Sequence, residues 1–146
     1  AILAELMRME QRGRLTAEQA AAVDCAQVAA LFASPVGQEL RAVPQEPMWR
    51  EYRFSVLEPV SKYLPEDVSG DEILLQGAVD CFFETEQGLT VVDFKTDRVA
   101  QGREAERAEE YRTQLTAYSD VLERIFEKPV RRRILYFFAT GRTLLL

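Results

Sequence analysis

Residues 75–95 read Leu75-Gln-Gly-Ala-Val-Asp80-Cys-Phe-Phe-Glu-Thr-Glu-Gln-Gly88-Leu-Thr-Val-Val-Asp93-Phe-Lys95. Two alternating apolar runs flank Glu86-Gln87-Gly88, a pattern that predicts a β-hairpin with strands at about 73–84 and 89–95. Folding about this turn places Asp80 opposite Asp93, or one residue away if Gly88 sits in a bulge. Lys95 falls on the face of Asp93 because side chains alternate along a strand. The hairpin therefore predicts two carboxylates and an ammonium group on one face.

The apolar residues of the hairpin are expected on the opposite, buried face: Val79, Cys81, Phe83, Val92 and Phe94. Opposed strand residues have Cβ atoms roughly 5 Å apart, so both carboxylates can bind one divalent cation. Two carboxylates beside an ammonium are what metal-assisted phosphodiester hydrolysis needs. The plain alternative is an Asp–Lys salt bridge on an exposed sheet face, which explains the charges but not the pairing of the two acids.

Length and composition limit the class of protein. The chain has 146 residues, 47% of them hydrophobic and 29% charged, as in soluble globular proteins. We expect one domain over 1–146, with a helical N-terminal part at 1–43 and a catalytic core at 47–140. No apolar run approaches the roughly 20 residues that span a bilayer, which predicts no membrane association. The chain has no initiator methionine and no signal peptide, so we expect a cytoplasmic fragment of a longer protein.

The cysteine and histidine counts restrict the chemistry further. The chain has no histidine and only two cysteines, Cys25 and Cys81, both expected to be buried free thiols. These counts exclude structural zinc, an iron–sulfur cluster, and Ser-His-Asp or Cys-His catalysis. A bound metal would be a hard, oxygen-liganded ion, which means Mg²⁺, Mn²⁺ or Ca²⁺.

The rest of the chain predicts an α/β fold. Helices are expected at 1–12, from the Thr16 capping box to about Phe32, from Ser34-Pro35 to about Ala42, and at about 104–127. Strands are expected at 48–57 and 131–139, with a loop at 58–71 and a short tail from Gly141. The crossover helix makes the last strand parallel to its neighbour, so the chain predicts a mixed β-sheet flanked by helices, an αβββαβ core.

Three further residues are candidates for the site. Gln114 and Tyr118 are four residues apart on one face of the long helix. The apolar or aromatic stripe of this helix is Tyr111, Leu115, Tyr118, Leu122 and Ile125. Tyr118 alone fits a core aromatic with its hydroxyl at the boundary, whereas packing explains Gln114 less well. Glu51 on the first strand fits a surface glutamate between arginines as well as a catalytic acid.

These motifs together resemble a known family. Glu51-Tyr-Arg-Phe54, Gly77-Ala-Val-Asp80, Asp93-Phe-Lys95 and Gln114-Leu-Thr-Ala-Tyr118 are similar to the ordered motifs of RecB-like nucleases in the PD-(D/E)XK superfamily. The chain is especially similar to the C-terminal nuclease domains of the AddA subunits of bacterial AddAB-type helicase–nucleases. The similarity covers about residues 30–146, and it implies a restriction-endonuclease-like fold.

The resemblance also implies a function in double-strand-break repair and recombination. Members are Mg²⁺-dependent deoxyribonucleases, with Mn²⁺ or Ca²⁺ able to substitute in binding. By this resemblance Asp80, Asp93 and the backbone carbonyl of Phe94 bind the metal, and Lys95 orients the attacking water. Gln114 and Tyr118 position the motif or the DNA backbone, and Glu51 completes the catalytic set. The implied partners are single-stranded DNA, the ATP-dependent helicase part of the same polypeptide, and a second, AddB-like nuclease subunit.

One departure from the family concerns the metal. Family members carry a metal-ligating histidine on a helix upstream of the Glu motif, and this sequence has none. The first residues resemble the end of a helix that begins upstream, so we expect that ligand to lie outside the sequence. The fragment is therefore predicted to bind metal weakly and to be a poor nuclease.

The net charge of −6 raises a question about DNA binding, because nucleic-acid-binding domains are usually basic. If a helicase delivers the DNA strand to this domain, the domain itself does not need a basic surface to attract it. Two alternatives stay open at this point: a non-catalytic strand-binding or assembly domain of the same fold, and an interaction domain whose charged strand face is a salt-bridge patch.

Overall fold

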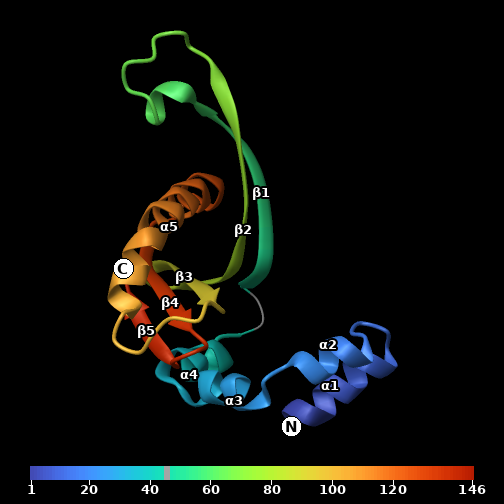
Figure 1. The fold of residues 1–146 in the computed structure, drawn as a ribbon. Helices are drawn as coiled ribbons and strands as arrows, with labels where there is room; N and C mark the ends of the chain where they lie inside the picture. The colour runs from blue at the N-terminus through green and yellow to red at the C-terminus, as the bar shows by residue number, and fades with distance from the viewer. Residues whose placement is uncertain (45–46) are drawn as a thin grey trace.

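The fold is known from a computed structural model that describes residues 1–44 and 47–146 (Figure 1). Four helices come first, then three strands, a long helix and two strands. Their bounds are α1 Ile2–Gln11, α2 Ala17–Ala22, α3 Cys25–Ala33, α4 Pro35–Ala42, β1 Met48–Pro59, η1 Val60–Lys62, β2 Glu72–Thr85, β3 Gly88–Lys95, α5 Glu104–Phe126, β4 Val130–Phe137 and β5 Arg142–Leu145.

The N-terminal helices begin where the capping signals predict, with one correction. The Thr16 side chain accepts a hydrogen bond from the Gln19 amide, and the Gln19 side chain accepts one from the Thr16 amide, so the predicted capping box is present. The predicted single helix from Thr16 to Phe32 is wrong, because the chain leaves helical geometry at Val23 and Asp24. Asp24 caps a new helix by accepting from the amides of Ala26 and Gln27, which satisfies donors that the break would leave unpaired.

The five strands form one mixed sheet in the order β1-β2-β3-β4-β5. β1–β2, β2–β3 and β4–β5 are antiparallel, and β3–β4 is parallel through the crossover helix α5. The predicted αβββαβ order is therefore confirmed. The residues after Gly141, predicted as a tail, instead form β5, which pairs with β4 from Ile134 to Phe137.

Helices cover both faces of the sheet (Figure 1). On one face α5 buries Leu115, Val121 and Leu122 against strand residues that include Phe82 and Val91. On the other face α3 and α4 contribute Leu31 and Val36 to a second cluster, whose strand members are Cys81, Phe83, Val92, Ile134 and Tyr136. The prediction that Ile125 belongs to the buried stripe of α5 is wrong, because Ile125 is exposed and Phe126 packs on the core instead.

The predicted buried face of the hairpin is only partly right. Val79 packs in the α5 layer, whereas Cys81, Phe83 and Val92 pack in the α3/α4 layer. Strand β1 changes face at the same level, because Trp49 and Tyr52, three residues apart, both contact Phe82. Between those two residues Glu51 has a φ of 49°, a conformation that interrupts strict alternation. The kink explains why a simple alternating pattern fails here.

Strands β1 and β2 continue together as an arm that curves away from the rest of the sheet (Figure 1). Their ladder runs from Met48↔Phe83 to Pro59↔Glu72, far beyond the last β2–β3 pair. The loop predicted at 58–71 is shorter than expected at its start, since β1 extends to Pro59 and η1 follows. Among the described residues, no helix is long and apolar enough to cross a membrane.

Candidate active site at the fork of strands β2 and β3

The two aspartates lie where β2 and β3 separate. The β2–β3 ladder runs from Thr85↔Gly88 to Cys81↔Val92 without a shift, so the bulge considered for Gly88 does not move this register. Continuing it by one position places Asp80 opposite Asp93. On its other edge β3 pairs with β4 along its length, and there Asp93 lies beside Leu135. A fork in a sheet leaves main-chain groups and side chains accessible between its two branches.

Asp80 bridges the fork through its side chain. Its Oδ2 accepts a hydrogen bond of 2.8 Å from the backbone N–H of Phe94, on the strand across the fork. This bond fixes the Asp80 carboxylate beside the Asp93-Phe94 peptide segment. The half-buried carboxylate is therefore held beside Phe94, and its charge contributes to raising the pKa of Asp93.

Asp93 is buried, with 6% of its surface exposed. Its Oδ2 lies 2.7 Å from the Lys95 ammonium and forms no hydrogen bond of good geometry with any residue that the structure describes. Burial raises the pKa of Asp93, while Lys95 opposes this shift and the nearby charge of Asp80 adds to it. The Asp–Lys salt bridge thus exists, but it is buried rather than on an exposed sheet face, where such a pair costs little.

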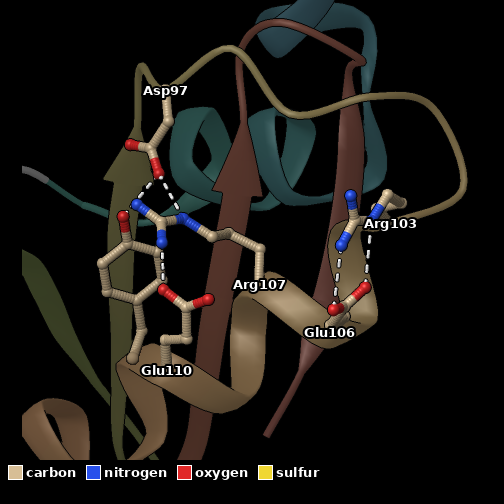
Figure 2. Close-up of polar contacts among 6 residues, drawn as sticks. Asp97, Arg103, Glu106, Arg107 and Glu110 are labelled. Carbon is tan, nitrogen blue, oxygen red and sulfur yellow. Dashed lines mark hydrogen bonds and ion pairs between the residues drawn. The ribbon is translucent and has the colours of Figure 1, made fainter.

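Lys95 also contacts helix α5. Its Nζ lies 3.7 Å from the centroid of the Tyr111 ring, a cation–π contact. The Tyr111 hydroxyl donates to Asp97, and this bond is the main cause that lowers the pKa of Asp97. Arg107 donates to the same carboxylate over 3.0 Å and to Glu110, so its guanidinium lies between two acids (Figure 2). Together these residues hold the lysine between a carboxylate and an aromatic ring.

Sequence reasoning placed Tyr111 in the apolar or aromatic stripe of α5 but did not predict its contact with Lys95. The sequence gives little indication of this contact. Tyr111 follows an acidic turn of α5, and only packing against the sheet decides which residues of that helix face Lys95. Asp97, two residues after Lys95, was one indication, because a lysine in a buried strand and a nearby aspartate often share hydrogen-bond partners.

Gln114 and Tyr118 contact each other rather than the acids of the fork. Gln114 Nε2 donates to the Tyr118 hydroxyl over 3.1 Å. The Tyr118 ring packs edge-on against Phe54, and both rings lie over Gly77, where an added Cβ would come within 2.8 Å of each. The structure therefore places Tyr118 against the β1–β2 arm, with Gln114 exposed beside it on α5.

Glu51 lies on the other branch, in the β1 position that faces Asp80 when the ladder is continued. Glu51, Asp80 and Phe94 line a hollow of about 1120 Å³ between the base of β1–β2 and the N-terminal helices. The Glu51 side chain is exposed, and its φ of 49° is an uncommon conformation for a residue with a Cβ. Such strain concentrates at functional sites, which supports Glu51 as a candidate without assigning its role.

The oxygen atoms of the fork fit a divalent cation that keeps several waters better than a metal held by protein ligands alone. Within the described part of the chain, no three His, Cys, Asp or Glu side chains form a metal-binding group. Mg²⁺ keeps several waters and takes one or two carboxylates. Two aspartates beside the Phe94 peptide match that requirement, although Asp93 Oδ2 is also paired with the Lys95 ammonium.

Comparisons with known proteins identify the family of this chain. The family model of the PD-(D/E)XK nuclease superfamily matches residues 1–144. The chain is 36% identical over 144 residues to the A subunit of the ATP-dependent helicase/nuclease of Desulforudis audaxviator, covering 96% of this chain and 11% of that protein. It is 36% identical over 139 residues to the protein of the same name from Bacillus pumilus, covering 89% of this chain and 11% of that protein.

The chain thus spans about a tenth of the length of these curated relatives. The solved structure of SSO0001 is similar at a TM-score of 0.45 and 16% identity, over 99% of this chain and 63% of that one, too low to bear on the fold. The family match over nearly the whole sequence is the decisive finding. The restriction-endonuclease-like α/β fold and the fork with its acids and lysine have a common explanation: this chain belongs to the PD-(D/E)XK nuclease superfamily.

Proposed function

We propose that this chain is a metal-dependent deoxyribonuclease domain that hydrolyses DNA phosphodiester bonds. The observation that carries the proposal is the fork: Asp80 and Asp93 flank the Phe94 peptide, and Lys95 lies 2.7 Å from Asp93 in a buried position. A non-catalytic domain of the same fold is not favoured, because burying an acid and a lysine together is costly without a role for them.

Asp80, Asp93 and the Phe94 carbonyl would hold the Mg²⁺. When bound, the ion supplies a water of lowered pKa and polarises the phosphoryl oxygen. Asp80 is already oriented by the Phe94 amide, so it needs little rearrangement to act as a ligand. Mn²⁺ or Ca²⁺ would bind the same oxygen ligands, since all three are hard cations.

Lys95 would orient the attacking water and stabilise the negative charge that develops on the phosphate. A cation held ready for a developing charge is most effective where water is largely excluded. Only 13% of the Lys95 side chain is exposed, and Asp93 and Tyr111 restrict where its ammonium can lie. Gln114, Tyr118 and Glu51 would contribute from the edges of the fork, by positioning the arm or the DNA backbone.

The larger setting is also proposed. The relatives are named as A subunits of ATP-dependent helicase/nucleases, and this chain corresponds to about a tenth of their length. We infer a helicase portion of the same polypeptide, a second nuclease subunit, single-stranded DNA as substrate, and a cytoplasmic role in double-strand-break repair. Because the sequence has no histidine, we propose that the isolated chain binds metal weakly and cleaves slowly. Cleavage by the chain at the rate of an intact relative would overturn that last point.

The test is cleavage of single-stranded DNA with Mg²⁺ by the protein and by Lys95→Ala. Loss of one preorganised charge-stabilising group costs about 100- to 1,000-fold in rate, so Lys95→Ala should lose nearly all cleavage. Lys128→Ala is the matched control, because Lys128 pairs with Glu84 at the sheet end away from the fork. Equal rates for Lys95→Ala and the unmodified protein would refute the proposal.

A further inference from the structure

We propose that the hollow between the N-terminal helices and the base of the β1–β2 arm binds the single-stranded substrate, with Arg14 and Arg41 contacting its phosphates. This inference rests on the proposed nuclease function and adds the surface that holds the strand. The hollow measures about 1120 Å³, large enough for more than a drug-sized ligand.

The hollow opens directly onto the fork. Asp80 and Phe94 form part of its wall, and both belong to the candidate metal site. Met9 and Arg14, from α1 and the turn after it, line the hollow with Phe32 of α3. In Figure 1 α1 and α2 stand apart from the sheet, beside the end of the arm where β1 begins. A chain lying in this space would therefore pass beside Asp80.

Arg14 and Arg41, two of the three arginines that line the hollow, differ from most lysines and arginines that the structure describes in this acidic chain. Ion pairs engage at least ten of its 18 lysines and arginines. By contrast, Arg14 and Arg41 are exposed and form no ion pair with any described acid. A guanidinium without a partner in the protein is available for bidentate contact with a phosphate. Arg12, Arg53 and Arg98 likewise form no ion pair with a described acid, but they do not line the hollow, whereas Arg14 and Arg41 both do.

The remaining wall suits unpaired bases. Phe32, which is 40% exposed, lies in the hollow with Met9, Leu40 and Met48. Single strands expose base faces that stack on aromatic and apolar side chains, whereas a duplex covers them. Arginines for the backbone and apolar side chains for the bases together favour a single strand over a duplex.

The binding test uses a short fluorescein-labelled oligonucleotide and the Lys95→Ala protein with Mg²⁺, so that the strand stays intact. Each of Arg14→Gln and Arg41→Gln should weaken binding several-fold, and the double variant more. Each should also reduce the slope of log K against log salt by about 0.7, the contribution of one phosphate contact on a single strand. Phe32→Ala should weaken binding while leaving that slope unchanged.

Arg112→Gln is the matched control. It removes one charge from the surface of α5, where Arg112 pairs with Glu109, and should change neither affinity nor slope. The proposal is overturned if the double variant binds like the control, or if a duplex of equal length binds as tightly as the single strand. It is also overturned if the protein forms a dimer that covers Phe32 and excludes DNA.

Failure of this inference and failure of the nuclease assignment have different signatures. Cutting of the strand by Lys95→Ala would contradict the proposed function, and the binding comparison would then be made without Mg²⁺ to keep the strand intact. Normal binding by the double arginine variant, together with an uncut strand, would reject the hollow alone. The expected outcome is weaker binding by the arginine variants and no cutting by any Lys95→Ala protein.

Discussion

The two sides of the fork differ in how many of their charged side chains are paired with other protein groups. On the α5 side, the contacts form a chain: Asp93 pairs with Lys95, and Lys95 lies over the Tyr111 ring. Asp97 then accepts hydrogen bonds from both Tyr111 and Arg107. On the hollow side, Glu51 is exposed and strained, and Asp80 is held by the Phe94 amide. The chain thus holds the Lys95 ammonium in place for the reaction. The side of the fork that faces the hollow stays open to a metal ion and a DNA strand.

The largest effect is expected from breaking the α5 side at Tyr111. Tyr111→Leu removes the ring beneath Lys95 and the hydroxyl that holds Asp97. By analogy with groups that orient a ligand, kcat should fall about 10- to 100-fold with KM for DNA little changed. Tyr111→Phe keeps the ring and should retain most of the activity. If Tyr111→Leu cleaves as fast as Tyr111→Phe, the cation–π contact has no part in positioning Lys95.

The next effect concerns the packing of α5 on the arm. Gly77→Ala would place a Cβ 2.6 Å from the Phe54 ring and 2.8 Å from the Tyr118 ring, so both aromatic rings must move. Overpacking of this kind costs about 1–3 kcal/mol of unfolding free energy. Urea denaturation measures it, with Gln76→Ala at the neighbouring position as the control. A stability equal to that of the control would show that the arm is loosely attached to α5.

On the hollow side, a substitution of Glu51 is expected to change stability by a smaller amount and to raise it. Its φ of 49° suits glycine, so Glu51→Gly should relieve strain and raise the unfolding free energy by up to about 1 kcal/mol. Glu51→Ala removes the same carboxylate without relieving the strain and is the matched comparison. Both variants should lose activity if the carboxylate contributes to the reaction. Equal stability of the two variants in urea would indicate that the kink stores no strain.

The smallest effect is a pH dependence on the α5 side. Hydrogen bonding by Tyr111 lowers the pKa of Asp97 below its usual 3.8, so its stabilising contribution is present above that pH and is lost as pH falls through the lower folded value. Asp97→Asn should therefore flatten the loss of stability below about pH 4 in acid titrations. If Asp97→Asn loses stability at low pH as steeply as the unmodified protein, other carboxylates cause that loss.

Local signals in the sequence predicted much of the fold. The hairpin register follows from the turn at Glu86-Gln87, and the helix starts follow from Thr16 and Ser34. The break at Asp24 carried its own capping signal, which the alanine-rich composition outweighed in the prediction. Strand β5 was missed because a four-residue edge strand becomes a strand only by pairing with β4.

The candidate site was predictable in part for the same physical reason. Asp80, Asp93 and Lys95 lie within one hairpin, so alternation and register bring them together. The face change at Glu51 could not be read from the sequence, because glutamate rarely adopts positive φ and tertiary packing imposes it. Tyr111 reaches the fork from α5, and Arg14 and Arg41 line the hollow from the turn after α1 and from α4. Their positions depend on packing between distant segments.

Asp80 and Asp93 at the fork are proposed to hold one divalent cation, and the nuclease assignment depends on this. Titration of the protein with Mn²⁺, followed by electron paramagnetic resonance, tests it without any assumption about DNA. We expect one bound Mn²⁺ per chain and an affinity about 10- to 100-fold lower in Asp80→Asn, with Asp71→Asn on the arm unchanged. Mn²⁺ binding that is equal in Asp80→Asn and Asp71→Asn would show that the fork holds no metal.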